Sequence, residues 1–267
     1  MNALLKVDNI GIRFGGLKAV DGLSLGINSG DLHGLIGPNG AGKTTCFNLL
    51  TGVYTPDQGS VTLAGRDLMR RRPFEITRLG LARTFQNIRL FPHLSVLENV
   101  MVACHLRSKQ TLVGAVLKSR FARHEEATMR KKSAELLHRF DLSARASIAA
   151  GALAYGDQRR LEIARALATE PKVLLLDEPA AGMNPQEKVA LKSLIRSVRD
   201  DFGVGILLIE HDMSVVMDLC NHITVLDHGC PIASGTPTEI QQNKKVIEAY
   251  LGAVEDLEPA MNAAERG

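Results

Sequence analysis

The stretch GPNGAGKTT, residues Gly37–Thr45, is the strongest indication of the fold. Glycines at these spacings let a backbone wrap closely around phosphate groups and point its N–H groups at their negative charge. Such a loop needs a strand before it and a helix after it. The apolar run Asp31–Ile36 predicts the strand, and a helix is expected from about Lys43. The sequence therefore predicts a nucleoside triphosphate site built from Gly37, Pro38, Asn39, Gly40, Ala41, Gly42, Lys43, Thr44 and Thr45.

Two residues of this loop carry specific chemistry in the pattern. Lys43 is expected to reach the β- and γ-phosphates, and the Thr44 hydroxyl to bind Mg²⁺. The predicted cofactors at this point are a nucleoside triphosphate and Mg²⁺.

A second apolar strand, Val173–Leu176, ends in a pair of carboxylates, Asp177 and Glu178. A carboxylate at the end of such a strand can hold the metal through water, and its neighbour can polarise an attacking water. The alternative is an Asp–Glu pair that caps a following helix. Beside a phosphate loop we favour the catalytic interpretation, with Asp177 serving the metal and Glu178 the water.

The composition is that of a globular protein, with 45% hydrophobic and 23% charged residues among 267. A formal charge of +3 is too small to indicate a nucleic-acid partner. The apolar runs are far shorter than the roughly 20 residues that span a bilayer, and the amino terminus does not have the pattern of a signal peptide. We expect a cytosolic protein, free to dock on a membrane protein, with four reduced cysteines.

The order of the predicted strands and helices along the chain indicates the fold class. The first third reads as strands, residues 95–146 have helical periodicity, and strands then alternate with helices to the end. This alternation predicts a largely parallel sheet covered on both faces.

Four further features occur in a fixed order around the two strands. Gln86 follows a strand in ARTFQNIRLF, and LAYGDQRRLEIARAL (153–167) precedes the carboxylate strand by one helix. The segment Ala181–Asn184 follows Glu178, and His211 follows the strand GILLIE. The ordered set resembles the nucleotide-binding subunit of ABC transporters over about residues 4–252.

The resemblance implies a fold and its limits. It implies an α/β P-loop NTPase, the ABC cassette, with a mostly parallel core sheet, an N-terminal antiparallel β-subdomain and an inserted α-helical subdomain. Residues 1–94 and 171–252 would form the core with the β-subdomain, residues 95–170 the helical subdomain, and residues 253–267 a polar tail.

The resemblance also implies roles for individual residues. Gln86 and His211 would join Lys43 and Glu178 in catalysis, and Thr44, Gln86 and Asp177 would serve the metal. Phe14 stands where the family has an adenine-stacking aromatic, although a core role is the alternative. In the family two ATPase subunits close head-to-tail, and each ATP lies between the phosphate loop of one subunit and the signature of the other. Here the signature residues are Ala154, Tyr155, Gly156 and Asp157.

Ala154 replaces the serine usual in that signature, so one hydrogen bond to a phosphate is missing. Such a bond to a charged group contributes about 1.5–3 kcal/mol, or roughly ten- to a hundredfold in rate. The loss does not disable the site, because Lys43, Mg²⁺ and backbone amides carry more of the charge. We therefore expect a working ATPase.

Longer motifs, among them RFGGLKAVDGLSL and VIEAYLG, look like the ATP-binding subunit of branched-chain amino acid importers. That resemblance implies a second, related ATPase subunit, two integral-membrane permease subunits and a periplasmic substrate-binding protein, with the chain peripheral on the cytoplasmic face of the inner membrane. Residues 87–97 would line the groove that receives the permease, unless they form a buried core turn.

Other functions remain open at this point. The same motifs fit an ATPase for urea or another small solute, or for lipopolysaccharide export. A soluble ABC protein of translation or DNA repair would be expected to carry two cassettes or coiled-coil insertions, and the sequence shows neither. A regulator that does not hydrolyse ATP would not need Glu178 and His211.

Overall fold

The computed structural model describes residues 3–107 and 120–255. The predicted polar tail from residue 256 on, and the part of the predicted helical region at residues 108–119, lie outside these ranges. The strands are β1 (Leu5–Phe14), β2 (Leu17–Ile27), β3 (Leu32–Ile36), β4 (Gln58–Leu63), β5 (Arg66–Asp67), β6 (Leu81–Arg83), β7 (Val173–Asp177), β8 (Gly205–Ile209), β9 (His222–Asp227) and β10 (Cys230–Gly235). The helices are α1 (Lys43–Leu50), α2 (Pro73–Leu79), α3 (Val96–Cys104), α5 (Arg120–Arg139), α6 (Tyr155–Leu167), α7 (Pro185–Phe202), α8 (Met213–Leu219), α9 (Pro237–Gln241) and α10 (Lys244–Glu255).

Two sheets organise these elements. The core sheet has the order β10-β9-β3-β8-β7-β6, and all its pairs are parallel except β10 with β9. The second sheet has the order β2-β1-β4-β5 and is antiparallel. The predicted α/β class is confirmed, with its mostly parallel core sheet and its N-terminal antiparallel sheet.

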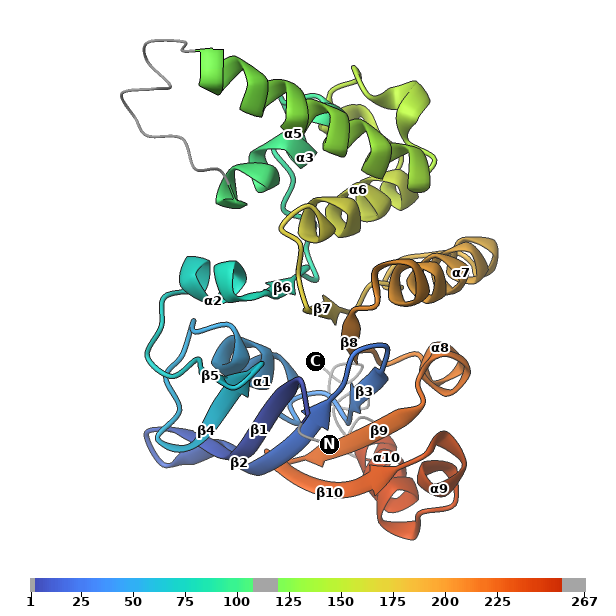
Figure 1. Cartoon of the computed structure of the whole chain (residues 1–267). Helices are drawn as coiled ribbons and strands as arrows, with labels where there is room; N and C mark the ends of the chain where they lie inside the picture. The colour runs from blue at the N-terminus through green and yellow to red at the C-terminus, as the bar shows by residue number, and fades with distance from the viewer. Residues whose placement is uncertain (1–2, 108–119, 256–267) are drawn as a thin grey trace, which may run out of the picture.

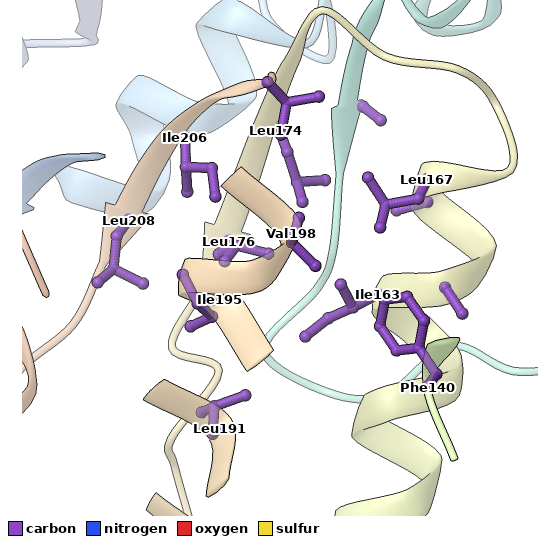
Figure 2. Close-up of a cluster of buried hydrophobic side chains, with 14 of the residues drawn as sticks. Phe140, Ile163, Leu167, Leu174, Leu176, Leu191, Ile195, Val198, Ile206 and Leu208 are labelled. Carbon is purple, nitrogen blue, oxygen red and sulfur yellow. The ribbon is translucent and has the colours of Figure 1, made fainter. Parts of the chain in front are cut away.

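The core strands β7 and β8 bury both faces. Because side chains alternate across a strand, Leu174 and Leu176 of β7 point to one face and Val173 and Leu175 to the other. Figure 2 shows the first pair facing apolar side chains of α7 and α6. The opposite face packs against α1, with Phe47 fully buried there. A strand covered on both sides must be apolar throughout, which is why these strands read as continuous hydrophobic runs.

A helical unit lies at the opposite end of the molecule from the antiparallel sheet (Figure 1). It consists of α3, α5 and α6, which pack on one another through residues such as Val100, Phe140 and Ile163. Ser95 begins α3 with a capping box, in which its hydroxyl accepts from the Glu98 backbone N–H. The inserted helical subdomain is thereby present. The residue limits assigned to the subdomains from the sequence stay a prediction.

Several elements were not predicted. They are β5, α2, β10, α9 and α10. The strand β10, CPIASG, contains a proline and small residues and pairs only with β9 at the sheet edge. An edge strand needs neither a continuous apolar run nor a full set of N–H donors, so its sequence gives little signal. Within the two described ranges, no helix has the length and apolar character needed to cross a bilayer.

Candidate active site

The loop between β3 and α1 is held in a conformation that glycine favours. Gly37 has a φ of 151° and Gly42 a φ of 97°, both in the range that residues with a Cβ rarely adopt. A Cβ on Gly37 would collide with the carbonyl oxygen of Leu226, and one on Gly42 with that of Ala19. The backbone thus forms the tight cradle that a phosphate chain requires.

Lys43 is drawn into this loop. Its Nζ donates to the carbonyl oxygens of Gly37 at 2.7 Å and Pro38 at 2.8 Å, and the residue is only 8% exposed. Burial lowers the pKa of Lys43, while the nearby carboxylates of Glu178 and Asp177 act to raise it. The ammonium group therefore lies between the loop and the two acids.

Three segments far apart in the sequence meet at Glu178. Gln86, after β6, donates from Nε2 to Glu178 Oε2 at 2.8 Å. Nδ1 of His211, after β8, lies 3.6 Å from the same oxygen. They meet because the carboxyl ends of parallel strands lie at one edge of the sheet. Glu178 itself has a φ of 44°, a left-handed conformation that costs a non-glycine residue energy and is often retained at functional sites.

Asp177, the residue before Glu178, is held in place by an arginine. The Arg83 Nη2 donates to Asp177 Oδ2 at 2.7 Å, and its Nη1 donates to Asn48 Oδ1 at 2.7 Å. The two charged side chains are 7% and 5% exposed. The guanidinium also packs on the rings of Phe47 and Phe85, with its carbon 5.4 and 5.1 Å from their centroids. One carboxylate oxygen of Asp177 is left without an Arg83 contact.

The residues predicted to serve the metal lie at or after the carboxyl ends of three strands of the core sheet, β3, β6 and β7. Thr44 lies in α1 after β3, Gln86 after β6 and Asp177 at the end of β7. They offer a hydroxyl, an amide and a carboxylate oxygen, the hard oxygen ligands that suit Mg²⁺ when water and phosphate complete the shell. The donor set fits the predicted ion.

The signature residues lie elsewhere. Ala154 caps α6, and α6 and α1 lie in separate parts of the molecule (Figure 1). Tyr155 is 43% exposed, and Asp157 pairs with Arg145 at 3.3 Å. Ala154, Gly156 and Asp157 line a hollow of about 170 Å³ together with Met183. One chain therefore keeps its signature apart from its own phosphate loop.

Phe14 lies at the end of β1 and is 45% exposed, so it is not a core residue. Its ring meets that of Tyr54 edge-on, with the centroids 5.2 Å apart. This support leaves Phe14 with ring surface free for stacking.

A groove of about 720 Å³ runs between α2, β6 and the helical unit. Leu90 and Phe91 line it, and Phe91 is 48% exposed. Arg89 and Arg165 add positive charge to the same walls. This part of the predicted 87–97 segment is therefore a groove lining rather than a buried core turn.

The sequence did not identify three charged residues of the site. They are Arg83, Arg159 and Glu162. Arg159 and Glu162 are 0% and 1% exposed and pair at 2.8 Å on α6. Their spacing of three residues was a detectable signal, because side chains three apart share a helix face. Arg83 gave only the weaker signal of a lone charge at a strand end.

The family follows from comparison with known proteins. The model of the family described as "ABC transporter" matches residues 20–181. The chain belongs to the ABC transporter family. It is an ATP-binding subunit with ATPase activity, so the predicted enzyme class is confirmed. A second family model, "Branched-chain amino acid ATP-binding cassette transporter", matches residues 230–256.

Relatives of this family cover almost the whole chain. The high-affinity branched-chain amino acid transport ATP-binding protein BraF of Pseudomonas aeruginosa is 45% identical over 249 residues, 93% of this chain and 98% of the relative. LivG of Salmonella typhimurium, described in the same words, is 48% identical with the same coverage. The lipopolysaccharide export system ATP-binding protein LptB of Haemophilus influenzae is 33% identical over 250 residues, 94% of this chain and 98% of the relative.

Solved structures of ATP-binding cassettes have the same fold as this chain. The ADP conformation of an ATP-binding cassette of an ABC transporter superimposes with a TM-score of 0.81 at 31% identity, covering 94% of this chain and 100% of the other. A nucleotide-free ATP-binding cassette gives 0.79 at 31% identity, covering 92% and 98%. The ABC cassette fold is confirmed.

Proposed function

We propose that this chain hydrolyses ATP to energise the import of branched-chain amino acids through a membrane permease. The observation that carries the proposal is the identity of 45–48%, over 93% of the chain, with ATP-binding proteins of branched-chain amino acid transport. The identity with the lipopolysaccharide export protein is 33%. The match of residues 230–256 to the branched-chain model supports the same choice.

Within the site, Glu178 acts as the general base for the attacking water. Gln86 and His211 support it, because both approach its Oε2. Lys43 and the backbone N–H groups of residues 37–45 hold the β- and γ-phosphates. These positioned charges stabilise the negative charge that develops in phosphoryl transfer.

The cofactor sites complete this arrangement. Thr44, Gln86 and Asp177 hold Mg²⁺, which neutralises phosphate charge when bound. Arg83 keeps Asp177 in place by its 2.7 Å contact. Phe14 stacks on adenine with the ring surface that Tyr54 leaves free.

The separation of the signature from the phosphate loop supports a head-to-tail pair of ATPase subunits. Residues 154–157 then face the nucleotide of the second, related subunit, where the start of α6 points its free N–H groups at phosphate. The groove at Phe91 receives the permease, in an assembly of two permease subunits and a periplasmic binding protein. The chain thus lies on the cytoplasmic face of the inner membrane.

The test is uptake of labelled leucine and, separately, labelled urea. Cells that lack the chain are complemented with the wild type or with Glu178→Gln. We expect leucine uptake at low concentration to return only with the wild type. Urea uptake that depends on the chain, with leucine uptake that does not, would leave the ATPase assignment standing and overturn the substrate.

A further inference from the structure

A closed ring of hydrogen bonds joins the start of α6 to Glu178. Gln86 Nε2 donates to Glu178 Oε2 at 2.8 Å, and the Gln86 carbonyl accepts from Arg159 Nη2 at 2.9 Å. The same Nη2 donates to Tyr155 Oη at 3.1 Å, and Tyr155 Oη donates to the Ala181 carbonyl at 3.0 Å. The Ala181 N–H donates to the Glu178 carbonyl at 3.2 Å and closes the ring.

On the Arg159 side, buried contacts hold this hydrogen-bond ring in place. Arg159 also donates from Nη1 to the Phe85 carbonyl at 2.8 Å, and Glu162 accepts from the Phe85 N–H at 3.2 Å. Arg159 and Glu162 are both buried and paired, so these are charge-assisted bonds in a medium of low dielectric constant. The backbone on the amino-terminal side of Gln86 is therefore fixed to α6.

The ring also has an exposed side. Tyr155 is 43% exposed, yet its hydroxyl bridges Arg159 and the D-loop, the segment Ala181–Asn184. The aromatic side chain of Tyr155 lies beside Gly182, where an added Cβ would meet it at 3.8 Å. This single hydroxyl thus links the signature of the chain to its own D-loop, and after its removal Arg159 keeps its bonds to Phe85, Gln86 and Glu162.

We propose that Tyr155 and Arg159 are positioning residues that hold Gln86 and the D-loop around Glu178, so that the start of α6 sets the hydrolytic competence of the same chain's own ATP site. This role is separate from contact between the signature and a nucleotide on a second subunit. It rests on the proposed role of Glu178 as the base. A permease or a second subunit that moves α6 would, through this ring, move the groups that surround Glu178.

The first test is Tyr155→Phe in the full chain, which keeps the aromatic side chain and deletes its hydroxyl. The hydroxyl makes two hydrogen bonds, one to the Ala181 carbonyl and one from the Arg159 guanidinium. Their loss predicts a kcat for ATP hydrolysis lower by about tenfold or more, with the KM for ATP unchanged within twofold. Hydrogen exchange of the amides in residues 181–184 should rise by a similar factor, while exchange in β7 and β8 stays as in the wild type. A changed KM with an unchanged kcat would show that the hydroxyl serves nucleotide binding instead, and would overturn the proposal.

The second test is a double-mutant cycle with Arg159→Lys. Arg160→Lys is the matched control, since Arg160 is the next residue of α6 and pairs at the surface with Asp141 at 3.6 Å. Because Tyr155→Phe and Arg159→Lys break the same ring, their effects on kcat should not multiply. Fully multiplicative effects would overturn the ring.

The proposal and the role of Glu178 fail in distinguishable ways. If Glu178→Gln keeps wild-type hydrolysis, the base assignment is wrong. If Glu178→Gln abolishes hydrolysis but Tyr155→Phe keeps both wild-type kcat and wild-type exchange, only the ring is wrong.

Discussion

Gln86 and Glu178, 92 residues apart in the chain, are joined by a hydrogen bond of 2.8 Å. Gln86 belongs to the segment that leads from the core sheet into the helical unit, whereas Glu178 directly follows β7 of the core sheet. Rotation of the helical unit against the sheet would therefore alter the surroundings of Glu178. The contact gives a physical route from the groove to the proposed ATP site.

Glu178→Gln should abolish turnover while keeping nucleotide binding. Loss of a general base lowers the rate about 10²- to 10⁴-fold, and glutamine has almost the same shape. Phosphate release and ATP binding measured on the same preparation would check this. Glu239→Gln is the control, because Glu239 only caps α9 and should leave hydrolysis unchanged. Turnover that persists in Glu178→Gln would exclude Glu178 as the base.

Arg83→Met should destabilise the fold strongly. The change leaves Asp177 buried without its partner, which costs about 3–5 kcal/mol. Arg196→Met is the matched control, since the Arg196–Asp218 pair lies at the surface with about two fifths of each side chain exposed, and should cost about 0–1 kcal/mol. Urea unfolding of both variants gives the difference. Equal midpoints would show that the Arg83 pair contributes no more than a surface pair.

Gly37→Ala should prevent ATP binding, or folding itself. The added Cβ would collide with the Leu226 carbonyl, and the φ of 151° is unfavourable for alanine. Gly16→Ala is the control, because no atom lies within 4 Å of a Cβ built there and its φ is outside the left-handed range. Fluorescent-nucleotide binding and thermal unfolding would separate the two outcomes. Wild-type affinity in Gly37→Ala would mean that the loop relaxes more easily than its packing indicates.

His33 should make the stability depend on pH. It is 3% exposed and bonded to Thr224, and burial, followed by the nearby His222, lowers its pKa from 6.5 to about 4. Between these two pH values His33 is protonated in the unfolded chain and neutral in the folded chain. The free energy of unfolding therefore falls by about 3 kcal/mol at most as the pH drops from about 6.5 to about 4, and it levels off below that.

His33→Gln should flatten that part of the pH profile of unfolding. His228→Gln should not, because its side chain is 93% exposed. Urea midpoints between pH 4 and 7.5 would test the pair of variants. A profile that keeps its slope in His33→Gln would assign the dependence to another group.

The local patterns of the sequence were sufficient for the fold class and for much of the candidate site. Phosphate binding imposes glycines and a lysine at fixed spacing, and buried parallel strands impose continuous apolar runs; both constraints act on neighbouring residues. These patterns were enough to locate Gly37–Thr45, β7 and Glu178. The edge strand β10 and the helices α2, α9 and α10 were missed, because a half-exposed element makes no such demand on its sequence.

Which charges lie inside, and what they touch, depends on contacts between distant parts of the chain. Arg83 meets Asp177 across 94 positions, and Arg159 meets the Phe85 carbonyl across 74. A charged residue at a strand end or on a helix face looks the same in sequence whether solvent or protein surrounds it. Burial, and with it the strength of these contacts, follows from how the sheet and the helical unit pack. The amino-acid sequence thus fixes the chemistry available at the site, and tertiary packing selects the groups that hold that chemistry in place.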